Sequence, residues 1–89
     1  MNHLGLLNTL LKLVALFRSK NDCEQEALEY LRRATAICTT CRGENSLDVA
    51  ILLNNAASLY NDLNDDNNCV QYLQKAYAIF QTYVVILSQ

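Results

Sequence analysis

The sequence predicts an all-α protein built from two stacked antiparallel helical hairpins. Residues 27–37 and 69–79 carry one pattern twice, and Tyr30 and Tyr72 set the offset at 72 − 30 = 42 residues. The 89 residues contain no proline and only two glycines, so helices can run without interruption. Apolar residues recur every three or four positions, which is the period of a helix facing a core. A repeat of this size is typical of helical hairpins, each of which buries its apolar face on a neighbour.

The two copies of the repeat predict which side chains lie inside the fold. The identical pairs are Tyr30/Tyr72, Leu31/Leu73, Ala34/Ala76, Ala36/Ala78 and Ile37/Ile79, and Arg33/Lys75 keeps its charge. The alanines allow two helix axes to approach to the close end of ~8–10 Å. The helical period predicts core faces on the last three helices: Tyr30, Leu31, Ala34 and Ile37 in the second, Leu53, Ala56, Ala57 and Tyr60 in the third, and Cys69, Tyr72, Leu73, Ala76, Ile79 and Phe80 in the fourth.

The first hairpin is expected over about residues 4–41, with helices at about 4–19 and 24–39. Either of two residue pairs could form the capping box of its second helix: Asn21 with Glu24, or Asp22 with Gln25. Residues 41–45 are predicted to form the loop that follows, and Gly43 is placed as the helix C-cap.

The second hairpin is expected over about residues 46–87. Ser46 can cap a helix that runs to about residue 63, and Asp48 places negative charge at the positive end of its dipole. Residues 64–67 are predicted to form a turn, and a final helix runs from about 68 to beyond 83. We expect residues 1–89 to form one domain that is part of a longer protein or assembly.

The composition narrows the classes of function. The chain is 52% hydrophobic and 18% charged, which excludes a disordered chain and suggests that a neighbouring repeat, chain or subunit covers part of the apolar surface. The net charge is −2 and no basic run is present, so neither nucleic acid nor a membrane is an expected partner. The acidic residues Asp62, Asp65 and Asp66 are read as a solvated turn, because the ligand pattern of a calcium loop is missing.

Targeting, metal and catalytic signals are weak. The apolar run at 4–17 is shorter than the roughly 20 residues of a membrane span and lacks the features of a signal peptide. We therefore expect reduced cysteines and a cytoplasmic protein, with cytoskeletal association as an alternative setting. Cys38 and Cys41 form a CxxC without a second pair, so we expect no metal, cofactor or required disulfide. The single histidine has no catalytic constellation around it, so we expect no enzyme activity.

The repeat resembles that of tetratricopeptide proteins. An Ala or Cys at the start of the second helix is followed by an aromatic-Leu pair and then by Ala. Residues 48–60 read Asp-Val-Ala-Ile-Leu-Leu-Asn-Asn-Ala-Ala-Ser-Leu-Tyr and resemble the Asp-Val-Ala-x-x-Leu-Asn-Asn-x-Ala-x-Leu-Tyr of kinesin-light-chain-type repeats, which share the 42-residue period. The resemblance covers about residues 11–79 and implies a right-handed superhelical fragment. It is weaker in the first helix, where Lys12-Leu13 replaces Asn54-Asn55.

The resemblance also implies a binding face, because in this family the first helix of each hairpin lines a concave groove. The paired asparagines there contact the backbone of an extended peptide, which points to Asn54 and Asn55, since an amide both donates and accepts hydrogen bonds. An alternative role is that these asparagines brace the neighbouring hairpin. The other expected groove residues are Ile51, Ser58 and Asn61, with Lys12, Leu16 and Ser19 in the first hairpin, where Lys12 is expected to be the basic residue of the face.

Three functions follow from these features. The leading one is a protein-interaction module that binds a partner peptide or protein through the concave face. The alternative is a structural subunit packed permanently into a larger cytoskeletal or motor-associated complex, for which folding would depend on concentration. A remote alternative is a small metal or redox protein that uses Cys38 and Cys41, which zinc content or the thiol redox potential would decide.

Overall fold

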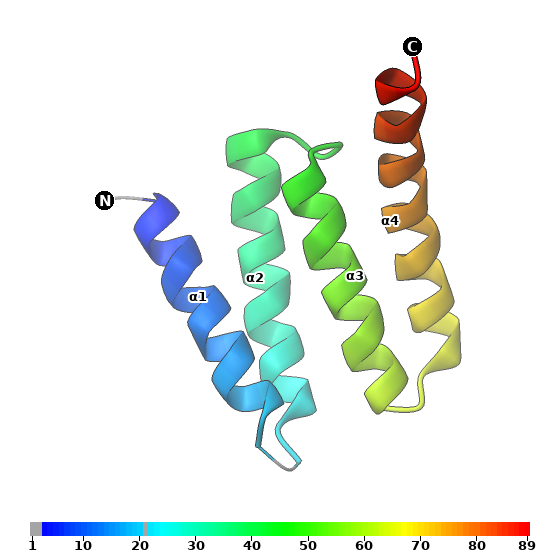
Figure 1. The fold of residues 1–89 in the computed structure, drawn as a ribbon. Helices are drawn as coiled ribbons and strands as arrows, with labels where there is room; N and C mark the ends of the chain where they lie inside the picture. The colour runs from blue at the N-terminus through cyan, green and yellow to red at the C-terminus, as the bar shows by residue number, and fades with distance from the viewer. Residues whose placement is uncertain (1–2, 21) are drawn as a thin grey trace.

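The computed structural model describes residues 3–20 and 22–89, and these residues form four helices and no strand. The helices are α1 (His3–Arg18), α2 (Glu24–Arg42), α3 (Leu47–Asp62) and α4 (Asp66–Leu87). They stand side by side in chain order, each antiparallel to the one before it (Figure 1). The predicted all-α fold of two stacked hairpins is therefore confirmed, with α1 and α2 as the first hairpin and α3 and α4 as the second.

The row of helices is thin. The Cα atoms extend over 44 × 37 × 16 Å, so much of each helix lies at a surface. α2 packs against both α1 and α3, whereas α4 packs against α3. The middle of the row can bury side chains on two sides, and the two outer helices have one uncovered side each (Figure 1).

The core runs along the inner faces of the four helices. Its fully enclosed side chains come mainly from α2 and α3, where Leu31, Cys38 and Leu59 are the largest. The alanines sit where helices meet, and Ala34, Ala50 and Ala57 have no exposed surface. This agrees with the prediction that small residues permit the close approach of helix axes.

The helix ends follow local capping chemistry. The Ser46 hydroxyl accepts a hydrogen bond of 3.1 Å from the Val49 amide and caps α3 as predicted. The Asp65 carboxylate likewise accepts a hydrogen bond from the Asn68 amide and caps α4. That helix therefore begins at Asp66 rather than at about residue 68. Asn64 has a φ of 61°, the left-handed conformation expected for a turn residue of this kind.

Two predictions at the ends of α2 are wrong. The residue before α2 is Cys23, which makes no side-chain capping hydrogen bond, so the Asp22–Gln25 capping box is absent; Asn21 lies outside the described residues. At the other end α2 continues through Cys41 and Arg42, which we had placed in the loop. The helix stops at Gly43, whose φ of 91° favours glycine and whose amide bonds to the Thr39 carbonyl.

The repeat preserves one cation–π contact in both hairpins. The Arg33 guanidinium lies 5.9 Å from the centre of the Tyr30 ring, and the Lys75 ammonium lies 5.0 Å from that of Tyr72. The retained charge at this position therefore has a structural role on the helix surface.

Candidate protein-binding surface

One face of α3 remains open and carries most of the residues that the sequence assigned to a groove. Asn54, Asn61 and Ile51 are exposed, and Ser58 is half-buried on the same face. Asn55 is half-buried and lies further round the helix. Among the described residues, neither asparagine amide at 54 or 55 hydrogen-bonds to another side chain. Within the described residues, the Asn54 amide therefore has no side-chain hydrogen-bond partner.

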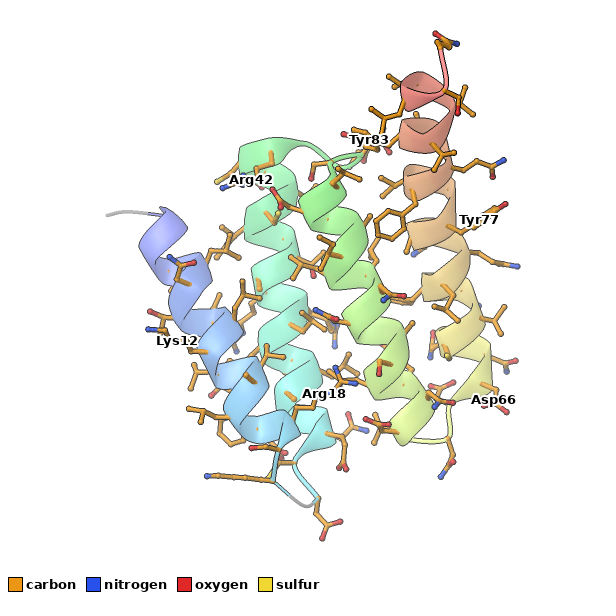
Figure 2. The ribbon with its side chains drawn as sticks, in the orientation of Figure 1. Lys12, Arg18, Arg42, Asp66, Tyr77 and Tyr83 are labelled. Carbon is orange, nitrogen blue, oxygen red and sulfur yellow. The ribbon has the colours of Figure 1, made fainter. Side chains whose placement is uncertain are left out.

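The three groove residues expected in the first hairpin lie on or directly after α1. Lys12, Leu16 and Ser19 are exposed and share one side of the helix. Figure 2 shows Lys12 on the edge of α1 that is turned away from α2 and α3. The Ser19 hydroxyl donates a hydrogen bond of 2.8 Å to the Leu16 carbonyl at the end of the helix.

Arg18 is a basic residue of the first hairpin that reaches the face of α3. It projects from the end of α1 across α2 (Figure 2). Its Nη2 donates a hydrogen bond to the Ser58 hydroxyl and lies 3.9 Å from the Asp62 carboxylate. The helical period did not reveal this contact, because Arg18 occupies the position equivalent to Tyr60 and acts through its long side chain.

A hollow of about 260 Å³ opens between α1 and α3 above the end of α2. Leu7, Asn8 and Leu11 line it from α1, and Ile51 and Leu52 line it from α3.

An ion pair stands at the same hollow. Arg42 Nη1 lies 2.9 Å from Asp48 Oδ2 and links α2 to α3 beside the buried Cys38 thiol. The hollow combines apolar walls with a charged rim, so it can accept an apolar side chain of a bound segment.

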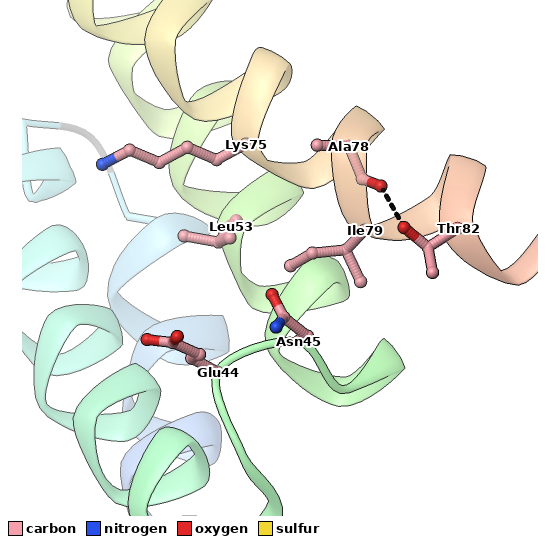
Figure 3. A pocket seen from close by; sticks show the side chains of 7 residues that line it. All are labelled: Glu44, Asn45, Leu53, Lys75, Ala78, Ile79 and Thr82. Carbon is pink, nitrogen blue, oxygen red and sulfur yellow. Dashed lines mark hydrogen bonds between the residues drawn. The ribbon is translucent and has the colours of Figure 1, made fainter.

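A larger hollow, of about 490 Å³, lies between α3, α4 and the loop before α3 (Figure 3). Leu53 and Ile79 form its apolar base, and Lys75 and Glu44 stand at its edges. It adjoins a second hollow of about 450 Å³ between α2 and α4, with which it shares Leu53 and Lys75. These hollows lie on a different side of α3 from Ile51 and Asn54, so they do not extend the predicted groove.

The two cysteines of the CxxC motif differ in exposure. Cys38 is buried and Cys41 is exposed, although only one helical turn separates them. Burial raises the pKa of the Cys38 thiol, and the nearby Asp48 carboxylate acts in the same direction. Within residues 3–20 and 22–89, no group of three or more His, Cys, Asp and Glu side chains could hold a metal ion. None of the helices described has the length and apolarity needed to cross a membrane.

The comparison with protein families agrees with the helical repeat. A model of the tetratricopeptide repeat matches residues 5–82, which cover most of both hairpins. No curated protein matches the chain, and no solved structure does. The match covers well over half of the residues and accounts for the four antiparallel helices, so the chain belongs to the tetratricopeptide repeat family.

Proposed function

We propose that this protein is an interaction module that binds an extended segment of a partner protein over the open face of α3. The observation that carries the proposal is the exposed Asn54 amide. It lies beside the exposed Ile51, and among the described residues no other side chain hydrogen-bonds to it. An extended peptide presents both N–H and C=O groups, and one Asn side chain can satisfy both. Membership of the tetratricopeptide family supports a protein partner in general.

The finer assignment, to repeats of the kinesin-light-chain type, rests on the sequence around Asn54 and Asn55 and on the 42-residue period. It favours a cytoplasmic adaptor or scaffold that holds a cargo or partner peptide. The half-buried Asn55 fits a supporting position next to the peptide better than a direct contact.

The surroundings suggest what the peptide carries. Ile51 and the hollow beside it offer an apolar contact at one end of the α3 face. Arg18 and Asp62 face each other at the other end and are both partly exposed, so a charged partner side chain can join or replace either one. We propose an apolar residue in the hollow and a charged residue near Arg18.

The test is a peptide-display selection against the 89-residue protein, followed by affinity measurements with the selected peptide. Asn54→Ala should weaken binding by roughly 2- to 12-fold, because a hydrogen bond contributes about 0.5–1.5 kcal/mol net. Its thermal stability should change little, since surface substitutions usually stay within about ±0.5 kcal/mol. Gln71→Ala, on the exposed side of α4, is the matched control and should bind as the unmodified protein does.

A second function, a permanently packed structural subunit, is favoured by the exposed apolar side chains of α4, among them Tyr77 and Val84. The two functions separate in the same pair of assays. If Asn54→Ala lowers stability and leaves peptide binding unchanged, Asn54 braces the fold and the structural function takes precedence.

A further inference from the structure

We infer that the groove between α2 and α4 is a second docking surface, and that it binds an amphipathic helix of a partner protein with acidic side chains at one end. The groove consists of the two adjoining hollows of about 450 and 490 Å³ and is called the α2–α4 groove below. It lies on a different side of α3 from the face proposed to bind an extended segment. All of its lining residues fall between positions 31 and 82, so both walls and the floor belong to this chain.

The α2–α4 groove has an apolar floor between two walls. Leu53 and Ala56 of α3 form the floor together with Ile79 of α4. Ala36 on the α2 wall and Ala78 on the α4 wall are exposed, and their short side chains leave the hollows open. Apolar side chains of another segment can therefore reach the floor, where their removal from water favours binding.

The dimensions of the groove suit a short helix. Its α4 wall runs from Tyr72 to Thr82, which is 82 − 72 = 10 residues. At 1.5 Å per residue this wall is about 15 Å long, which is about three turns of a bound helix. A helix of that length presents one apolar row at three- and four-residue spacing, and such a row can fill both hollows.

The hydrogen bonds of the walls favour a helix over an extended segment. The hydroxyls of Thr35 and Thr39 each donate a bond of 2.8 Å to a carbonyl of their own helix, and that of Thr82 donates one of 3.0 Å (Figure 3). No Asn or Gln is among the described residues that line the hollow between α2 and α4. An extended backbone would leave polar groups unpaired over this apolar stretch, whereas a helix pairs its own.

One end of the α2–α4 groove has an excess of positive charge. Lys75 lies 5.0 Å from the centre of the Tyr72 ring and forms no ion pair with any residue that the structure describes. Arg32, which lines the same hollow, shares the Glu29 carboxylate with Arg33, each at 3.4 Å. Exposed pairs of this kind hold their partners weakly. Arg32 and Lys75 can therefore attract acidic side chains, although the whole chain has a net charge of −2.

The other end of the groove carries the opposite charge. Glu44 and Asn45 approach it from the loop before α3, and Figure 3 shows Lys75 and Glu44 on either side of Leu53. The charges thus differ between the two ends of the apolar floor. A complementary helix has acidic residues at the end near Lys75, an apolar row in the middle, and a polar or basic residue near Glu44.

The test begins with a phage library of helical peptides randomised on one face, selected against the 89-residue protein. The selected peptides should carry Asp or Glu at one end of an apolar row. Lys75→Glu should weaken the selected peptide by about ten-fold or more in fluorescence anisotropy, because it turns an attraction into a repulsion. A peptide whose acidic residues are replaced by Lys should bind this variant better than the original peptide does.

A second variant blocks the groove without changing its charge. Ala36→Trp fills the hollow between α2 and α4 from an exposed position and should abolish binding. Lys12→Glu makes the same charge change on α1, outside the groove, and is the matched control that should bind normally. Asn54→Ala should also bind the helical peptide normally, which separates this surface from the one proposed for an extended segment. Circular dichroism should show unchanged helix content in all four variants.

Four results would overturn the inference. A selection that yields no helical binder shows that the α2–α4 groove does not accept a helix. A selected peptide whose affinity is the same for folded Lys75→Glu and Ala36→Trp as for the unmodified protein binds elsewhere. A charge-reversed peptide that gains nothing on Lys75→Glu shows that its acidic end does not meet Lys75. A bound peptide without helical circular dichroism shows that the occupant is extended.

Discussion

The two hairpins share one sequence pattern but differ in how much of it is buried. Leu31 of the first hairpin has no exposed surface, while its identical counterpart Leu73 in the second is 43% exposed. The residues on either side behave in the same way, since Thr35 is half-buried and Tyr77 is largely exposed. The difference shows that a repeat residue becomes core only when a neighbouring helix covers it.

The comparison also shows which contacts each hairpin makes alone. Ala34 and Ala76 are both buried, and the contact of Tyr30 with Arg33 recurs between Tyr72 and Lys75. These positions face the partner helix of the same hairpin or lie along one helix, so they need no further repeat. The position of Leu31 and Leu73 is the part of the pattern that depends on stacking.

The largest expected difference between the hairpins is the effect of truncating this leucine. Leu31→Ala should lower the free energy of unfolding by about 2–5 kcal/mol, because it opens a cavity in a closed core. Leu73→Ala should cost about 1 kcal/mol or less in a dilute sample, since part of its side chain is already in water. Urea denaturation of both variants at low protein concentration measures the difference, and equal losses would mean that the hairpins are not stacked as described.

Enlarging the shared alanine should affect both hairpins. Ala76→Phe is expected to cost about 1–3 kcal/mol by overpacking the contact of α3 with α4. Ala34→Phe should cost at least as much, because α2 has helices on both sides. Ala78→Phe, at an exposed position of α4, is the control and should leave the melting temperature nearly unchanged. A normal melting temperature for Ala76→Phe would show that the buried side of α4 is assigned wrongly.

A smaller effect is expected from the ionisation of the thiol of Cys38, which follows Leu31 in α2. Burial holds its pKa above the ordinary value of 9.0, so the folded protein keeps the thiol protonated while the unfolded chain ionises. The stability from this group is present below pH 9 and declines as the pH rises through and above that value. Denaturation midpoints of the unmodified protein and Cys38→Ser between pH 7 and about pH 10 measure this decline.

Thiol labelling compares the solvent exposure of equivalent positions in the two hairpins directly. A maleimide should modify exposed Cys41 rapidly and Cys38 slowly, as read by mass spectrometry. A cysteine placed by Phe80→Cys, the equivalent of Cys38, should react faster than Cys38 because position 80 is half-buried and Cys38 is fully buried. Similar rates at positions 38 and 80 would contradict the difference in coverage.

The sequence predicted the helices and their pairing because both depend on local patterns. The 42-residue offset and the 3.6-residue period identify four helices, and Ser46 marks the start of α3. The end of α2 was placed too early, since Thr39 to Arg42 carry no signal that separates a last helical turn from a loop until Gly43.

Features that depend on distant neighbours could not be predicted in this way. The apolar period places Leu73 on a core face, but its exposure is decided by the absence of a covering helix within the chain. The reach of Arg18 from α1 to Ser58 and Asp62 depends on a long side chain crossing α2, and helical periodicity contains no information about such contacts.

The central claim is that the same repeat position is buried at Leu31, where α3 packs on α2, and exposed at Leu73 on α4. Methyl NMR with a soluble paramagnetic agent tests it at equivalent positions. The agent should broaden the methyl signals of Leu73, which is 43% exposed, and leave those of the buried Leu31 sharp. Leu31 broadened as strongly as Leu73 would contradict the claim.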